Sequence, residues 1–263
     1  MSRADSTPRI ASLVPSLTEL VIALGLAPRL VARTGFCVHP AEVVKSIAKV
    51  GGTKDVNLDK LRRLAPTHVL LNVDENRLDT VQALRSWPVD ERPELIVTHP
   101  LTPSDNLVLI DQMLGAFGHL DGVPQRAQAL RAAFEHELAA TVPQRHAEQR
   151  VLYLIWRDPW MTVARDTYIS RMLALVNWHT LPDTAGGAQG AARYPVLRGD
   201  ETWLGDVQQV LLSSEPYAFA EQDFGAARAL CPYARVRIVD GELISWYGPR
   251  AAAGLRYLRT LAA

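Results

Sequence analysis

The sequence predicts an α/β protein of two lobes, each with a mainly parallel sheet, joined by a single long helix with a ligand cleft between the lobes. Short apolar runs alternate with helical patterns over short connections, which is typical of parallel strands covered by helices. This alternation stops at 121–145, where apolar side chains recur every three or four positions, and it restarts at Val151. An ordinary surface helix within one domain is the alternative that the pattern leaves open.

The long helix sets the predicted domain boundaries. Its apolar positions are Val123, Ala127, Leu130, Phe134, Leu138 and Val142. Pro124 suits the first turn, which needs no backbone donor there, and Pro143 is expected to end or bend the helix. We therefore assign 1–120 to an N-terminal α/β lobe, 121–149 to the linking helix and 150–263 to a C-terminal α/β lobe.

Each lobe is expected to alternate strands and helices. In the first lobe we expect strands at 9–15, 29–33, 68–73 and 94–97, separated by helices, and in the second lobe strands at 151–155, 210–212 and 236–239. Ser16 to Glu19 matches a capping box at the start of the first helix. Gly25 is expected to end that helix, and Asn57 to cap the helix at 58–64. Asp240-Gly241 is expected to form a turn, and 186–194 a loop.

Composition excludes several classes of partner and location. The 263 residues carry no formal net charge and no basic run, so neither nucleic acid nor an anionic membrane is an expected partner. No stretch approaches the length of a membrane span, and 1–9 is polar, so the chain as written predicts a cytoplasmic protein without membrane insertion. We expect a monomer. Cys37 and Cys231 lie in opposite halves without metal-type spacing and are expected to be unpaired.

Residues for catalysis or metal binding are sparse. Ser213-Ser214 lacks the flanking glycines of a nucleophile elbow. His39, His68 and His99 each lie near a strand or loop end, so a three-histidine metal site is an alternative. His68 begins its strand rather than ending it, which directs it to the wrong edge of the sheet. We therefore expect no catalytic residue, no metal site and no cofactor, and we expect that the protein is not an enzyme.

Candidate ligand-binding residues follow the predicted strands, because ligands of open parallel sheets bind outside the carboxyl ends. These positions are Pro15, Ser16, Phe36, Asp74, Glu75, Trp156, Glu215, Pro216, Tyr217, Trp246 and Tyr247. Gly52 and Thr53 follow Gly51 in a segment where the backbone can approach a ligand closely, although the phosphate-loop pattern is missing. Trp156 could stack on a flat, partly apolar ligand, whereas the alternative is that the aromatic rings pack beneath their own loops.

An ordered series of motifs carries a family resemblance that covers nearly the whole chain. The motifs are RIASLVPSLTE (9–19), VGGTKDVN (50–57), LRRLAPTHVLLN (61–72), LYLIWRDPWMTVARDT (152–167), LLSSEPY (211–217) and VDGELISWYG (239–248). The series resembles the cobalamin-binding branch of the helical-backbone metal-receptor superfamily, the solute-binding proteins of metal-chelate ABC importers. This resemblance implies two α/β lobes joined by one rigid helix, a shallow cleft and a periplasmic or other extracytoplasmic location.

The resemblance also implies roles for individual residues. The ligand contacts that it implies are Pro15, Ser16, Phe36, Trp156, Tyr194, Trp246 and Tyr247. In such receptors one acidic residue on each lobe docks on the permease. The first-lobe position falls on Leu78, so its neighbours Glu75 and Asp79 are the candidates, with Glu215 or Glu221 on the second lobe.

The resulting hypothesis is a non-enzymatic binding protein for a corrinoid such as cobalamin, or for a related metal chelate, with an ABC permease as partner. One alternative is an iron-siderophore or haem binding protein. The other is a cytoplasmic protein that handles corrinoids, either an enzyme or a chaperone. Turnover of a corrinoid would support this last alternative, and saturable binding without turnover would contradict it.

Overall fold

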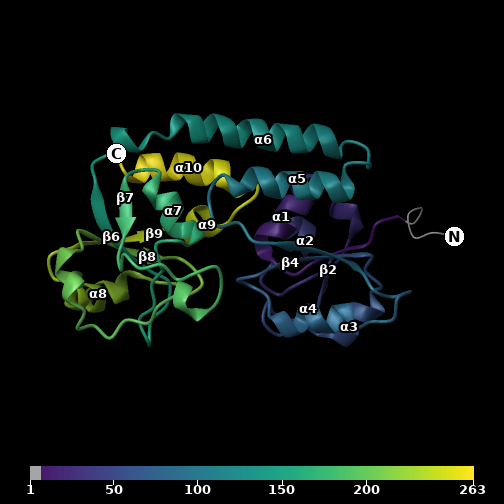
Figure 1. Ribbon diagram of the computed structural model, residues 1–263, viewed down its shortest axis with the longest axis horizontal. Helices are drawn as coiled ribbons and strands as arrows, with labels where there is room; N and C mark the ends of the chain where they lie inside the picture. Colours follow the sequence, from purple (N-terminus) through teal and green to yellow (C-terminus); the bar gives the residue numbers. More distant parts are fainter. Residues whose placement is uncertain (1–6) are drawn as a thin grey trace. The chain divides into compact units, whose positions relative to one another are not determined.

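The computed structural model describes residues 7–263, which form two compact units (Figure 1). Of the described residues, 7–99 and 107–131 form unit 1, and 100–106 and 132–263 form unit 2. The division falls inside the long helix α6 (Val123–Ala140), close to the helix predicted from the apolar spacing. The linking role of 121–149 stays a prediction.

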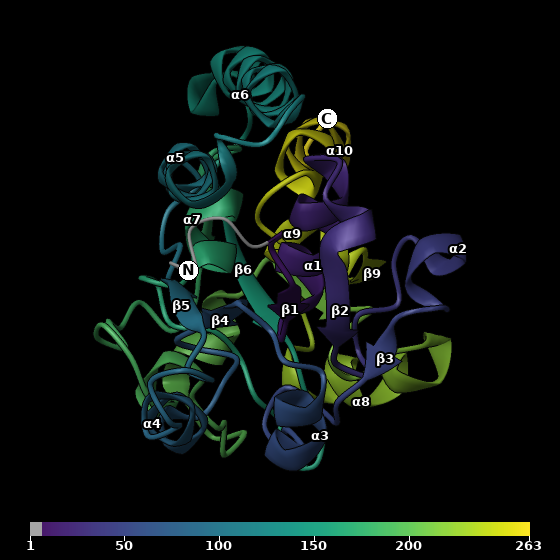
Figure 2. The same cartoon turned by 90° about the vertical axis from the view of Figure 1, so that its right-hand side faces the viewer.

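Unit 1 contains a five-stranded parallel sheet in the order β3-β2-β1-β4-β5. Its strands are β1 (Ile10–Ser12), β2 (Leu30–Arg33), β3 (Ala48–Lys49), β4 (His68–Asn72) and β5 (Glu94–Thr98). Its helices are α1 (Pro15–Ala23), η2 (Ala27–Arg29), α2 (Ala41–Val44), α3 (Leu58–Arg63), α4 (Leu78–Arg85) and α5 (Asp105–Phe117), of which α5 begins in unit 2. Figure 2 shows α1 and α5 on one face of the sheet and α3 and α4 on the other.

Unit 2 contains a four-stranded parallel sheet in the order β7-β6-β8-β9. Its strands are β6 (Gln149–Leu154), β7 (Trp178–Thr180), β8 (Gln209–Ser213) and β9 (Arg235–Val239). Its helices are η3 (Pro143–Arg145), α7 (Tyr168–Ala174), η4 (Ala191–Arg193), η5 (Thr202–Asp206), η6 (Glu221–Asp223), α8 (Phe224–Leu230), α9 (Gly241–Ser245) and α10 (Arg250–Leu261). In Figure 1, α7, α9 and α10 cover one face of this sheet and α8 covers the other.

Alternation along the central strands of each sheet supplies the core. Alternate residues of β6 and β8, such as Leu152 and Leu212, pack with Ala227 and Cys231 of the α8 region in one buried cluster. The intervening Tyr153 is fully buried on the other face. Because both faces are covered, the central strands are apolar along their length, and the polar side chains are left for the strand ends.

The first helix begins differently from the predicted capping box. It starts at Pro15, and its N-cap is Val14, without a side-chain hydrogen bond. Thr18 Oγ1 instead bonds Ser12 Oγ (2.8 Å) and Val14 O (3.0 Å). The hydroxyl of Ser16 is buried and has no hydrogen-bond partner among residues 7–263.

Two cap predictions were right and one turn prediction was wrong. Gly25 follows the end of α1 with φ +80°, the left-handed backbone that favours glycine. Asn57 accepts the amide of Lys60 as the cap of α3. Asp240 does not form a simple turn, because its carboxylate accepts the Leu243 amide (3.0 Å) and caps α9.

Candidate ligand-binding site

The two sheets share a feature that locates ligand sites in open parallel sheets, a point where the strand order reverses. The reversal lies between β1 and β4 in unit 1, and between β6 and β8 in unit 2. Predicted residues that follow these four strands are Pro15, Ser16 and Glu75 in unit 1, and Trp156, Glu215 and Tyr217 in unit 2. Each unit therefore brings part of the predicted set to the edge where a ligand surface is expected.

Unit 2 gathers four rings at its reversal point, which we call the aromatic group: Trp156, Trp160, Tyr217 and Phe219. The Trp156 ring meets Tyr217 edge-on, with centroids 5.7 Å apart, and Tyr217 lies 4.6 Å from Phe219. Phe219 stacks on Trp160 at 6.0 Å. Phe219 is 5% exposed whereas Trp156 is 41% exposed, so the group is anchored in the core at one end and open at the other.

An ion pair holds together the two loops that carry the aromatic group. Arg157, next to Trp156, pairs with Asp223, which is completely buried. The same guanidinium lies over the Trp160 ring, 5.6 Å from its centroid. Asp223 also accepts the backbone amide of Ala220 (2.9 Å). The loops after β6 and β8 are therefore fixed to each other, which positions Trp156 beside Tyr217.

Glu215 connects the loop after β8 to the last loop of the chain. Its Oε1 accepts hydrogen bonds from Ser245 Oγ (2.7 Å) and from Trp246 Nε1 (2.6 Å). Burial raises the pKa of Glu215, and the two hydrogen bonds partly oppose that rise. Trp246 and Tyr247 are only 8% and 6% exposed, so both rings pack inward. Their contact with a ligand stays a prediction.

Tyr194 lies in a segment that pairs with the loop after β6. The Thr162 amide donates to Pro195 O (3.0 Å), and the Ala164 amide donates to Arg193 O (2.9 Å). Tyr194 is half-buried. The segment 193–196 therefore borders the loop that carries Trp156, a pairing that no motif in the sequence indicates.

Unit 1 has one strongly exposed ring at its carboxyl edge, Phe36, which is 63% exposed. A Cβ on the buried Gly52 would lie 3.3 Å from the Phe36 ring and 2.3 Å from Asp55 Oδ1. The glycine therefore permits a close approach within the chain, and its contact with a ligand stays a prediction. Thr53 is half-buried beside it.

Asn76 is a residue of this edge that the sequence reading missed as a site residue. Its side-chain amide donates to Leu13 O (3.2 Å) and Thr53 O (3.0 Å), and its Oδ1 accepts the Asn72 amide (2.8 Å). Asn76 thereby joins the loops after β1, β3 and β4. The feature of the sequence that could have identified Asn76 is its position shortly after the apolar strand predicted at 68–73.

The acidic candidates for permease docking differ in their surroundings. Asp79 is exposed and pairs with Arg77 at 2.8 Å, and the same guanidinium holds the pKa of Asp79 below its usual range. Glu75 is half-buried, and Glu221 is exposed. Their docking role stays a prediction.

The three histidines of the alternative metal site are not gathered at one edge. His68 begins β4 and lies 3.6 Å from Glu94, whereas His99 follows β5 and lies 3.5 Å from Asp74. Since the two strands are parallel, these histidines lie at opposite edges of the sheet. Within residues 7–263, no group of three or more His, Cys, Asp or Glu side chains could hold a metal ion. Cys37 and Cys231 are both buried and free, as predicted.

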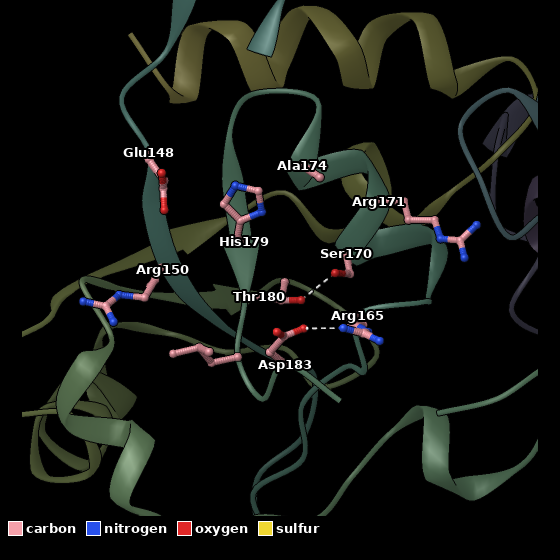
Figure 3. A pocket seen from close by; sticks show the side chains of 10 residues that line it. Glu148, Arg150, Arg165, Ser170, Arg171, Ala174, His179, Thr180 and Asp183 are labelled. Carbon is pink, nitrogen blue, oxygen red and sulfur yellow. Dashed lines mark hydrogen bonds and ion pairs between the residues drawn. The ribbon is translucent and has the colours of Figure 1, made fainter. Parts of the chain in front are cut away.

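Two cavities in unit 2 lie away from the predicted residues. The first, of about 390 Å³, borders α7 and β7 and is lined by Glu148, Arg150, Arg165, Ser170, Arg171, Ala174, His179, Thr180, Leu181 and Asp183 (Figure 3). Ser170 and Thr180 are hydrogen-bonded there, and Arg165 pairs with Asp183. The second, of about 290 Å³, opens at the amino ends of β6, β8 and β9. The second cavity lies at the amino ends of the strands, and neither cavity is lined by the aromatic group. Because ligands of open parallel sheets bind outside the carboxyl ends of the strands, we place the candidate surface at the aromatic group.

Comparison with solved structures shows the same architecture in metal-chelate receptors. The periplasmic vitamin B12 binding protein BtuF of Vibrio cholerae has a TM-score of 0.76 at 18% identity, covering 96% of this chain and 95% of that one. A periplasmic heme binding protein from Pseudomonas aeruginosa gives 0.78 at 19% identity, with 97% and 92% covered. The heme binding protein HutB of V. cholerae gives 0.74 at 23% identity, with 97% and 99% covered. At these identities the likeness shows the fold.

Sequence comparison reaches the family. A curated relative is an uncharacterized ABC transporter substrate-binding lipoprotein, YvrC, of Bacillus subtilis (strain 168), 25% identical over 268 residues, covering 95% of this chain and 78% of the relative. The model of the family described as periplasmic binding protein matches residues 10–192, more than half of the chain. Among the helices of residues 7–263, none has the length and apolar character that crossing a membrane requires. This protein therefore belongs to the periplasmic binding protein family, as its resemblance to the helical-backbone metal receptors implied.

Proposed function

We propose that this protein binds a corrinoid or a related metal chelate, as the substrate-binding component of an ABC-type uptake system. The observation that carries the proposal is the aromatic group at the reversal point of the unit 2 sheet, with Trp156 exposed at its open end. An exposed ring held by a buried ion pair offers a flat, ordered surface to a macrocycle at little entropic cost. Phe36 is the corresponding ligand surface that we propose for unit 1.

Family membership supports the transport role. The relative from B. subtilis is described as a substrate-binding lipoprotein of an ABC transporter, and structural neighbours are described as binding vitamin B12 or heme. An extracytoplasmic location follows from this role, in place of the cytoplasmic location that the polar N-terminal residues indicated. Iron-siderophore and haem binding are the nearest alternatives for the ligand.

Titration with cyanocobalamin tests the proposal directly. The protein is expected to bind it saturably, with a heat of binding and a shift in the corrin absorbance, while the ligand is recovered unchanged. Iron protoporphyrin IX and a ferric siderophore, titrated in parallel, rank the alternatives. Failure to bind any of the three would overturn the proposal, and chemical conversion of the corrinoid would favour the enzymatic alternative.

The proposed docking on a permease depends on acidic residues of each unit. We propose that Glu75 or Asp79 on unit 1 and Glu221 on unit 2 contact the permease, because exposed charges steer association more than they set ligand affinity. Reversing the charge at one of these positions is expected to slow uptake and leave ligand affinity unchanged. A loss of ligand affinity instead would place that residue in the binding surface.

A further inference from the structure

We infer that the ligand surface of unit 2 accepts a metal chelate without net negative charge and rejects anionic chelates, with Glu215 as the residue that sets this preference. The inference rests on the proposed function and adds the charge class of the ligand. It depends on how the charged groups around the aromatic group are paired.

Four arginines near the carboxyl edge of the unit 2 sheet have partners within the protein. The pairs are Arg157 with Asp223, Arg165 with Asp183 (3.1 Å), and Arg250 with Glu242 (2.6 Å). Arg193 is 1% exposed and donates to Gly187 O (2.8 Å). A carboxylate or catecholate on a ligand is best bound by charge-assisted hydrogen bonds, above all from a bidentate arginine. To bind an anionic ligand in this way, Arg157 would have to break its ion pair with Asp223. The buried carboxylate of Asp223 would then have no partner of opposite charge, which is strongly unfavourable.

Carboxylates at the same edge are less fully paired. Glu215 lies two residues before Tyr217, and the donors on its Oε1 are neutral, a serine hydroxyl and an indole N–H. Arg250 and Glu242 also face it, and their charges act on it in opposite directions. Asp158, two residues after Trp156, has a side chain that is 89% exposed and a long contact to Arg157 (3.8 Å). A ligand on the aromatic group therefore meets negative charge.

The fitting ligand has an apolar ring face for Trp156 and N–H donors at its rim. A corrin with amide side chains has both, and its amide N–H groups can donate to carboxylates. A porphyrin with two ionised propionates places negative charge where the protein already has it, and like charges brought together at an interface weaken binding.

A matched pair of ligands tests the inference. Cyanocobalamin carries no net charge, and its monocarboxylate, in which one side-chain amide is hydrolysed, has nearly the same shape and one negative charge. Calorimetry on the full chain is expected to show at least about tenfold weaker binding of the monocarboxylate, and weaker binding of iron protoporphyrin IX. Raising the salt concentration should reduce the difference in affinity between cyanocobalamin and its monocarboxylate, because salt screens exposed charges.

The variant Glu215→Gln should also reduce this difference in affinity, because it removes the negative charge and keeps a hydrogen-bond acceptor. Glu91→Gln is the control, because it removes one exposed charge just before β5, at the opposite edge of the unit 1 sheet. The salt series needs no variant, so the test stands even if Glu215→Gln does not fold. If the anionic chelates bound as tightly as cyanocobalamin, or more tightly, this inference would be overturned and the proposed function would stand. Failure of every chelate to bind would overturn both.

Discussion

Replacing Trp156 by alanine separates a ligand-binding role from a structural one. The ring is 41% exposed, and its aromatic contact is the edge-on approach to Tyr217 at 5.7 Å. Such a contact contributes about 1 kcal/mol to the free energy of unfolding. Its loss should lower Tm by about 2–4 °C for a chain of this size. Loss of a ring stacked on the ligand should weaken binding about tenfold or more, equivalent to about 1.4 kcal/mol.

Trp178→Ala is the matched control for this experiment, because Trp178 lies in β7, outside the aromatic group. Its side chain is 3% exposed, and the Arg237 guanidinium lies over its ring, 5.8 Å from the centroid. Its truncation should lower the free energy of unfolding by about 3 kcal/mol, as large-to-small changes at buried sites do. The folded fraction should keep its affinity. Trp156→Phe retains a ring and should recover most of the binding lost in Trp156→Ala.

The assay is calorimetric titration with cyanocobalamin, with a thermal melt of each variant in the same buffer. A sharp drop in Tm with unchanged affinity in Trp156→Ala would refute the reasoning. It would show that Trp156 is a structural plug and that the ligand binds elsewhere.

Two further predictions concern stability and the thiols. Hydrogen bonds from Arg259 (2.5 Å) and Arg256 (2.8 Å) lower the pKa of Glu137, which joins α6 to α10. A folded-state pKa below the ordinary value of 4.5 contributes stability that is present above pH 4.5 and lost as the pH falls through the lowered pKa. Glu137→Gln should therefore lower the free energy of unfolding by about 1–3 kcal/mol at pH 7 and by much less at pH 3. Chemical denaturation at the two pH values measures this, with Glu135→Gln as the control. An equal loss of stability at both pH values would contradict this prediction. Cys37 and Cys231 should react with a thiol reagent only after denaturation, because both are buried. Burial also raises the pKa of both thiols, that of Cys231 to about 11. Reaction of either thiol in the native protein would contradict this prediction.

Periodicity and strand-end position accounted for much of the fold. The apolar spacing of 121–145 predicted α6 within a few residues. This helix buries one face, so its apolar residues recur with the helical period. The sequence-based prediction missed β3, β7, α2 and α9, each of five residues or fewer. Strands of similar length were predicted where they contain a continuous apolar run, as β4 and β8 do.

The sequence alone determined the class of fold, the family resemblance and which residues follow the strands. Only the tertiary structure decided which of them meet: Trp156 lies against Tyr217, while Trp246 turns inward to Glu215. It also decided that Arg157 is committed to Asp223, 66 positions away in the chain. The physical reason is that strand order sets which loops become neighbours. Hydrogen bonds and ion pairs between distant residues have no period in the sequence, so the charge left for a ligand could be seen only after the chain had folded.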